Sequence, residues 1–220
     1  MIRLFQLCFF VLVLSIGGVS IDAPAQTDSS WVGPYETDDS IAVYSRKVPE
    51  SRILEFKAVC VLNVPPGIVF QAVMRRDTYR HTSKYVVEFR IIHSDESNAF
   101  YIYQRIAIPL FKDRDYTLRY EEMQDSLHGH YSLVWTIAND KGPPPDENVV
   151  RIETSRGAFE MFPEKEGTKT RLICTIYVDP GGSIPGWLAD IGNRSTLPDL
   201  LRAIRDNSMS EHDSERTDEN

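Results

Sequence analysis

The sequence predicts an α+β fold in which a long antiparallel sheet curls round a carboxy-terminal helix. Two strand candidates and one helix come first, and about six further strand candidates precede the last helix. Most of the connections are too short for the crossovers that parallel strands need, so a doubly wound α/β sheet is excluded. The turn sequence Asp-Pro-Gly-Gly at 179–182 ends the strand-rich part, and Pro185 stands where a proline begins a helix.

The early elements follow from alternation and from helical spacing. Runs at 40–48 and 53–63 alternate as strands on either side of a turn-like Pro-Glu-Ser. Pro65 and Pro66 then open a helix, which apolar residues at helical spacing continue to about Tyr79. The later strand candidates, separated by turn sequences, are 85–93, 100–108, 116–123, 130–138, 149–162 (in two pieces or bent at Gly157) and 170–178.

The last helix carries two apolar faces. The first comprises Trp187, Leu188 and Ile191, and the second comprises Leu200, Leu201 and Ile204. On one straight helix these faces would point in different directions. Pro198 is therefore predicted to break the helix, with Ser195 or Thr196 capping the second segment. Both faces could then turn toward the concave side of the sheet.

The amino terminus has the pattern of a secretory signal peptide. Arg3 precedes an almost wholly apolar run at 4–16, which is short for a membrane span, and small residues at 23–25 offer a cleavage site. An uncleaved anchor is the alternative. The sequence predicts a signal peptide at 1–25, one domain at 26–207 and a secreted, periplasmic protein.

The net charge of −8 is concentrated at the carboxy terminus. Six acidic residues and only one cation, Arg216, follow Arg205, which leaves a charge of about −3 on the predicted domain. No basic stripe is available for a nucleic-acid backbone, so that class of partner is excluded. The polar segment 208–220 lacks apolar periodicity and is predicted to be a disordered acidic tail.

Two cysteines follow the leader, Cys60 and Cys174, each on the apolar side of a strand candidate. A disulfide between them requires neighbouring strands in a suitable register. Two separately buried thiols are the favoured alternative. Neither cysteine has the basic or histidine surroundings of a nucleophile.

No motif predicts covalent chemistry, a metal or a cofactor. The run Asp113-Arg114-Asp115 could supply a general acid and base, but we favour a structural role in which the charges fix a loop to its strand. His128 and His130 share one face of a strand candidate without a recognisable third metal ligand. No serine lies in a nucleophile-elbow motif.

At this point ordered matches along the chain indicate a family. They are Trp31, the run at 40–48 with Arg46, Glu55-Phe56-Lys57-Ala58, Pro109-Leu110 with Asp113 to Tyr116, Val150-Arg151, the turn 179–182, Ile184-Pro185 and Trp187-Leu188. In this order and near family spacing, the chain resembles a START domain, the steroidogenic acute regulatory protein-related lipid-transfer family with the helix-grip fold. It resembles a bacterial-type, secreted member.

The resemblance implies a hydrophobic tunnel between the curved sheet and the closing helix, able to hold one lipid. Tyr120 stands where sterol-binding members place a buried arginine, which leaves phospholipids, other isoprenoids and aromatic polyketide-like molecules as ligands. The chain is thus expected to carry or sense a lipid or other hydrophobic small molecule as a monomer, without covalent chemistry. An enzyme that uses the cavity as a mould, like the related cyclases, is the alternative.

The residues expected to form the tunnel and its gate come from the sheet, from one loop and from the last helix. They are Leu110, Phe111, Arg114, Tyr116, Tyr120, Trp135, Trp187, Leu188, Ile191 and Leu201. In the resembling family, the loop around Leu110 and Phe111 lies beside the closing helix at the tunnel mouth. An apolar tip followed by Lys112 also suits transient contact with a membrane. Packing of the tip on Trp187 and Leu188 without any opening is the alternative.

Overall fold

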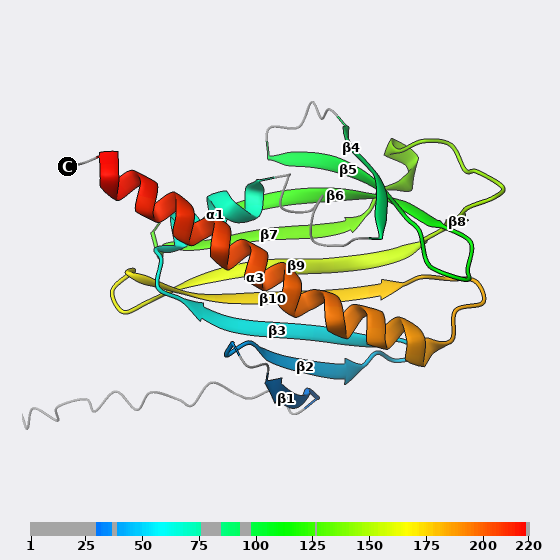
Figure 1. Cartoon of the computed structure of the whole chain (residues 1–220), viewed down its shortest axis with the longest axis horizontal. Coiled ribbons are helices and arrows are strands. Elements are labelled where there is room, and N and C mark those ends of the chain that lie inside the picture. The colour runs from blue at the N-terminus through cyan, green and yellow to red at the C-terminus, as the bar shows by residue number, and fades with distance from the viewer. Residues whose placement is uncertain (1–29, 37–38, 76–84, 93–97, 126, 219–220) are drawn as a thin grey trace, which may run out of the picture.

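The structure is a computed structural model that describes residues 30–36, 39–75, 85–92, 98–125 and 127–218. Its strands form one sheet in the order β1-β2-β3-β10-β9-β7-β6-β5-β4, in which each neighbouring pair is antiparallel (Figure 1). The strands are β1 (Val32–Glu36), β2 (Ala42–Lys47), β3 (Leu54–Leu62), β4 (Val86–Ile92), β5 (Ala99–Ile106), β6 (Arg114–Asp125), β7 (His130–Ile137), β8 (Val150–Arg151), β9 (Thr154–Glu164) and β10 (Lys169–Asp179). β8 pairs with β6 in parallel, beside the main order.

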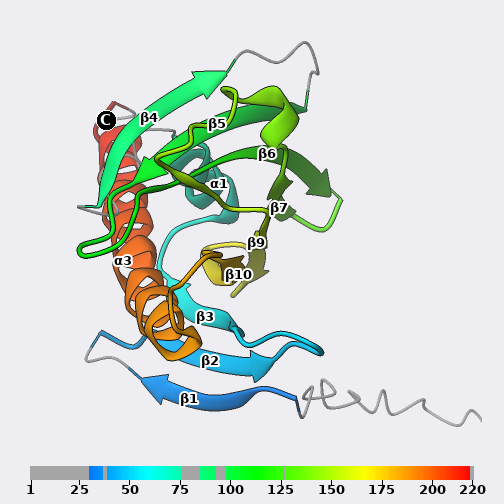
Figure 2. The ribbon, with the colours of Figure 1, turned by 90° about the vertical axis from the view of Figure 1, so that its right-hand side faces the viewer.

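Two α-helices lie in the concavity of this sheet. They are α1 (Pro66–Met74) and α3 (Gly186–Asp218), and Figure 2 shows the sheet curving round both of them. A short 3-10 helix, η1 (Asn139–Lys141), follows β7. The predicted α+β architecture, with a curved antiparallel sheet wrapped round a carboxy-terminal helix, is confirmed.

The helix α1 begins as predicted, with Pro66 in its first turn. It ends at Met74 within the described residues, and the predicted continuation to Tyr79 lies outside them. Its apolar residues are buried between the sheet and α3, and Val69, Ala72 and Val73 have no exposed surface. This end of the concavity is therefore a filled core.

The helix α3 is continuous, so the predicted break at Pro198 is wrong. The hydroxyls of Ser195 and Thr196 do not cap a second segment; both donate to the carbonyl of Gly192, at 3.1 and 2.9 Å. A proline inside a helix removes one backbone hydrogen bond, and here that cost does not end the helix. Because the helix runs on, its two apolar faces diverge, as a constant helical period requires.

The sequence predicts a disordered tail from residue 208, whereas the structure continues α3 to Asp218. No glycine or proline interrupts 199–218, so a helix that has already been nucleated by packing can propagate at little cost. Ser208 is fully buried, and its hydroxyl donates to the carbonyl of Ile204 at 2.7 Å. The helix α3 therefore runs past residue 207, the predicted end of the domain.

The structure adds one strand to those predicted and divides another. β1 was not expected, and it pairs with β2 as the edge of the sheet. The strand predicted at 149–162, in two pieces or bent at Gly157, is in two pieces, with the interruption at 152–153. Gly157 instead lies within β9, where a Cβ atom would come 2.1 Å from Cζ2 of Trp135. The glycine therefore makes room for a tryptophan ring.

The two cysteines are free and buried. Their strands, β3 and β10, are antiparallel neighbours, but Cys60 is opposite Leu172 and Cys174 is opposite Ala58. The thiols thus occupy a diagonal pair, in which side chains are further apart than in a directly opposed pair. The structure therefore has two free, buried thiols, which is the alternative that the sequence favoured over a disulfide.

Candidate functional site

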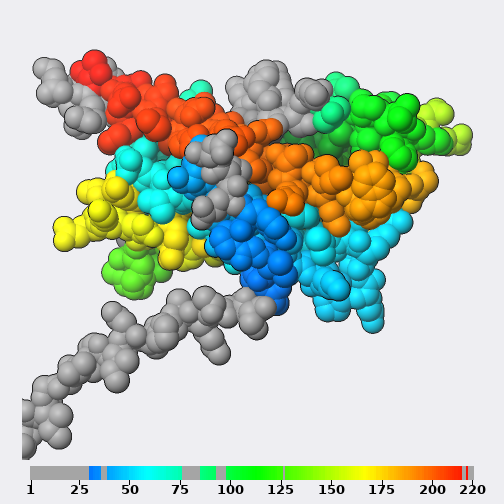
Figure 3. Space-filling view, turned by 60° about the horizontal axis from the view of Figure 1, so that its bottom comes forward, coloured from blue at the N-terminus to red at the C-terminus, as the bar shows by residue number. Residues whose placement is uncertain are grey.

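A cavity of about 610 Å³ lies between the concave face of the sheet and the first half of α3. Strands β5, β6, β7, β9 and β10 form its wall, and Leu188, Ile191 and Leu200 line it from the helix. The loop that joins β5 to β6 closes one side. Figure 3 shows that loop, in green, beside the orange first half of α3 on one face of the molecule.

The loop between β5 and β6 presents an apolar tip at this cavity. Leu110 is fully exposed at a relative exposure of 102% and has a φ of 70°, which is uncommon for a leucine. Phe111 donates its backbone N–H to the carbonyl of Ile108 at 3.0 Å, which closes the turn. Ile108 to Phe111 line the cavity together with Leu188 and Ile191 of α3. The loop and the helix therefore meet at the cavity, as the resemblance implied.

An aromatic row crosses the deeper part of the wall. Tyr120, Trp135 and Phe159 come from β6, β7 and β9, and their ring centroids are 5.9 and 5.2 Å apart along the row. Tyr120 is directly opposite Trp135 in the sheet, and Gly157 is opposite Trp135 on the other side. The register of these strands therefore builds an aromatic floor of mutually tilted rings, and all three aromatic residues line the cavity.

One neutral polar pair is set into the same wall. Gln104 of β5 is directly opposite Tyr116 of β6, and the Tyr116 hydroxyl donates to Oε1 of Gln104 at 2.6 Å. Burial raises the pKa of Tyr116 well above its usual value, so this hydroxyl keeps its proton throughout the physiological range. The pair offers hydrogen bonding without charge.

Arg114 is the one cation among the described residues that line the cavity, and only 1% of its surface is exposed. Its Nε donates to the carbonyl of Pro180 at 3.3 Å, its Nη2 to that of Gly181 at 3.4 Å, and its Nη1 to that of Lys112. The ring of Phe111 lies 5.7 Å from the guanidinium carbon. Burial lowers the pKa of Arg114. The side chain therefore links the loop of residues 107–113 to the turn that precedes α3.

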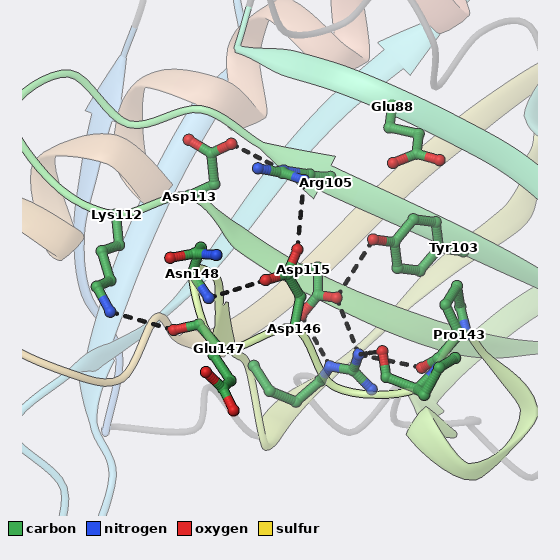
Figure 4. Close-up of polar contacts among 12 residues, drawn as sticks. Glu88, Tyr103, Arg105, Lys112, Asp113, Asp115, Pro143, Asp146, Glu147 and Asn148 are labelled. Carbon is green, nitrogen blue, oxygen red and sulfur yellow. Dashed lines mark hydrogen bonds and ion pairs between the residues drawn. The ribbon is translucent and has the colours of Figure 1, made fainter.

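The two flanking carboxylates do not pair with Arg114. Asp113 accepts from Nε of Arg105 at 2.8 Å, and Asp115 accepts from Nε and Nη2 of Arg151 at 2.8 and 2.9 Å (Figure 4). Asp115 also accepts from the hydroxyl of Tyr103 at 3.2 Å, and that contact contributes to raising the pKa of Tyr103 after the larger effect of burial. These contacts fix the base of the loop, which matches the structural role favoured from the sequence.

The first half of α3 is held to the sheet by polar contacts. Asp190 accepts from the backbone N–H of Leu54 at 2.9 Å, and Asn193 donates to the carbonyl of Val178 at 3.3 Å. Gly186 lies so close to the β2–β3 connection that a Cβ atom would be 2.7 Å from the carbonyl oxygen of Arg52. The helical side of the cavity is thus anchored, while the tip at Leu110 is exposed.

Eight of the ten predicted site residues line the cavity: Leu110, Phe111, Arg114, Tyr116, Tyr120, Trp135, Leu188 and Ile191. The other two do not. Trp187 is 66% exposed on the outer side of α3, and Leu201 is fully buried in the core against α1 and the sheet. Both positions follow from the unbroken helix, which separates the faces that the prediction had brought together.

Several lining residues were not predicted, among them Gln104, Ser155, Phe159, Ile176 and Asn193. Alternation along β9 places Ser155 and Phe159 on the inner face, so that signal was present in the sequence. Gln104 carried no such signal, because β5 is buried on both faces through Gln104 and does not alternate.

Histidines and possible metal ligands lie apart from this cavity. His128 is in the β6–β7 turn, where its Nδ1 lies 2.8 Å from Oδ2 of Asp125, and His130 stacks on Phe162. Among the residues that the structure describes, no group of three histidine, cysteine or acidic side chains is placed to hold a metal ion. No helix within the same residues is long and apolar enough to cross a membrane. The predicted signal peptide at 1–25 lies outside them.

Sequence and structure comparisons connect the chain to lipid-transfer proteins. It is 24% identical over 185 residues to the phosphatidylcholine transfer protein of mouse, which covers 83% of this chain and 85% of that protein. The human phosphatidylcholine transfer protein is 23% identical over 188 residues, with the same shares covered. No protein-family model matches the chain.

Solved structures show the fold. A fragment of a STAR-related lipid transfer protein from Xanthomonas axonopodis superposes with a TM-score of 0.70 at 22% identity, which covers 82% of this chain and 99% of that one. Human STARD10 gives a TM-score of 0.71 at 16% identity and covers 87% of this chain and 78% of that one. The fold is therefore START-like, as the sequence resemblance implied.

Proposed function

We propose that the chain binds one lipid, or another hydrophobic small molecule, in the cavity under α3 and carries it between membranes without covalent chemistry. The observation that supports this most is the cavity itself. About 610 Å³ of space has a mostly apolar lining from the sheet, the loop and the helix. That size falls within the range of small-molecule sites. The sequence similarity to phosphatidylcholine transfer proteins supports the same conclusion.

Binding would be a partition between two apolar environments. Each methylene that leaves water for the cavity gains about 0.8 kcal/mol, but a lipid that leaves a membrane loses a similar amount. Net transfer is then nearly neutral in free energy. The rate of transfer would depend on opening a path past the loop of residues 107–113, because the first half of α3 is anchored by Asp190 and Asn193.

The surface around that path suits brief contact with a membrane. Leu110, Trp187 and Ile191 are exposed apolar side chains on the two elements that meet at the cavity. Lys112 follows the tip, is exposed, and donates to the carbonyl of Glu147 at 3.2 Å. Apolar residues that dip into a bilayer while a lysine stays at the headgroups are typical of interfacial binding.

Carriage is favoured over the cyclase-like alternative by the side chains at the cavity. Among the described lining residues there is no histidine, cysteine, aspartate or glutamate that could act as a general acid or base. A lipid sensor would use the same cavity and differ in its partner. We further propose, from the leader alone, that the protein acts outside the cytoplasm, in the periplasm.

Transfer between vesicles tests the proposal. The chain from Gln26 onward would be mixed with donor vesicles that contain a self-quenched fluorescent lipid and with unlabelled acceptor vesicles. We expect the protein to accelerate transfer in proportion to its concentration, with the lipid recovered unchanged. No acceleration with any lipid extracted from the native envelope would contradict carriage, and recovery of a chemically altered lipid would favour the enzyme.

A further inference from the structure

The charge in the cavity wall favours an anionic head. Arg114 has five N–H donors, and the carbonyls of Lys112, Pro180 and Gly181 take three of them. Within the described part of the chain, no carboxylate lies within 4 Å of its guanidinium, because Asp113 and Asp115 are bound by Arg105 and Arg151. A buried charge is costly unless an opposite charge compensates it. Arg114 thus has two donors left for a ligand, and the charge of Asp113 acts on it without a direct contact.

The location of this charge sets the orientation of the ligand. Arg114 begins β6 beside the loop tip and the turn before α3, whereas Tyr120 and Trp135 lie further along the sheet. On β6, the inward positions after Arg114 are Tyr116, Leu118 and Tyr120, and all of them line the cavity. A chain that extends inward from Arg114 would therefore pass a polar pair first and end on the aromatic floor.

We infer that the cavity takes a lipid with an anionic head, a carboxylate or a phosphate, which Arg114 binds while an apolar chain lies along the inner face of β6. This inference rests on the proposed function and specifies its ligand. The carrier would then serve anionic lipids, such as fatty acids or lipids with a phosphate head, rather than neutral ones.

The test compares ligands on the unchanged protein. Isothermal titration calorimetry with the chain from Gln26 onward would use palmitate, methyl palmitate, palmitoyl lysophosphatidate and a diacyl phosphatidylcholine, each delivered from cyclodextrin. We expect at least one anion to bind about ten-fold to a hundred-fold more tightly than methyl palmitate, which has the same chain, as charged hydrogen bonds predict. The ratio of the two anions then identifies the preferred head. Equal affinity for methyl palmitate and both anions would overturn the anionic site.

Two variants separate the charge of Arg114 from its structural contacts. Arg114→Lys keeps the charge and should keep most of the preference for an anion, whereas Arg114→Met should lose that preference and still bind methyl palmitate. Arg52→Met is the matched control, because Arg52 is a nearby cation that donates to the carbonyl of Gly182 at 3.3 Å and does not line the cavity. An anion preference that survives Arg114→Met would overturn the assignment to this residue.

Methyl palmitate distinguishes failure of this inference from failure of the proposed function. Methyl palmitate bound as tightly as both anions would overturn the anionic head while leaving carriage intact. Absence of binding by all four probes would overturn carriage itself, and the inference with it.

Discussion

Two consecutive parts of α3 show how one helix can serve two purposes. They are residues 186–196, called its first half here, and residues 197–204, called its second half. From Leu197 to Ile204 the inward side chains are buried almost completely: Leu197, Leu201 and Ile204 expose at most 1% of their surface. From Gly186 to Thr196, by contrast, Trp187 and Ile191 are more than half exposed, and Leu188 faces open volume. The second half is core except at Leu200, which still lines the cavity, whereas the first half borders a space that the chain does not fill.

The difference follows from what each half meets. The second half packs against α1, which fills the concavity at that end of the sheet. Among the residues that the structure describes, no helix accompanies the first half, and the curved sheet and the loop at 107–113 enclose a cavity there instead. Apolar residues in the second half should therefore determine stability, and those at the first half and the loop should determine ligand exchange.

Leu201→Ala should have the largest effect on stability. Removing a fully buried leucine leaves a hole in a packed core and typically costs about 2–5 kcal/mol. Urea unfolding followed by circular dichroism measures the loss. Ile191→Ala, on the same helix but 57% exposed, is the control and should cost less than about 1 kcal/mol. Equal losses in the two variants would remove the distinction between the two halves.

Leu110→Glu should slow lipid transfer while leaving the fold intact. The side chain is fully exposed, so the substitution should change the free energy of unfolding by less than about 0.5 kcal/mol. If the tip enters membranes, losing burial of one leucine should lower the transfer rate about ten-fold. The vesicle assay measures it, with Leu127→Glu as the control, because Leu127 is 87% exposed in the turn at the far end of β6. Identical rates in the two variants would exclude the tip from membrane contact.

Asp39→Asn should weaken the attachment of the second half of α3. Asp39 accepts from Nε of Arg202 at 2.6 Å and from Nη2 of Arg205 at 3.2 Å, and the hydrogen bond to Asp39 raises the pKa of Arg202. Partly exposed pairs of this kind contribute about 1 kcal/mol, less at high salt. Asp199→Asn removes a more exposed partner of Arg202 and should cost less. In 1 M sodium chloride the electrostatic screening length is on the order of 3 Å, so the loss of stability should shrink there. A loss that stays the same would argue against an electrostatic origin.

Ionisation of the two buried thiols should have the smallest effect on stability. Burial raises the pKa of Cys60 from 9.0 to about 11 and raises that of Cys174 as well. A raised pKa means that the folded state holds the proton more tightly, so stability from these thiols is complete below pH 9 and is lost as the pH rises toward 11. In a chain that begins at Gln26, no thiol should react with a disulfide reagent at pH 8 while folded, and two should react after denaturation without reductant. Finding none after denaturation would show a disulfide.

How far the sequence predicts this molecule depends on the range of the interactions involved. Alternation and turn residues identified most strands and the sheet-helix order, because these signals are local. The predicted break at Pro198 was wrong because a proline breaks an isolated helix, whereas α3 is stabilised by the burial of Leu197 and Leu201 on either side of the proline. The site was predicted where a family motif contained its residues, as at Arg114. It was missed at Gln104, whose place depends on its register with Tyr116.

In the loop of residues 107–113, the sequence alone does not distinguish the roles of Leu110 and Phe111. From the sequence, Phe111 and Leu110 are equivalent apolar residues of a tip, and Phe111→Glu is a natural test of a gate. In the structure Phe111 is half-buried with its ring over Arg114, so that substitution would change the cavity wall as well as the tip. Only the three-dimensional arrangement identifies Leu110 as the cleaner position.

Native mass spectrometry of the protein purified from its native source tests the central claim, that the space under the first half of α3 holds one lipid. We expect the mass of the chain plus one intact lipid. Ala189→Trp, which fills the cavity from the helix, should lose that lipid and remain folded, whereas Asp199→Trp on the exposed side of the second half should keep it. A wild-type chain without bound lipid, or full occupancy in Ala189→Trp, would contradict the account.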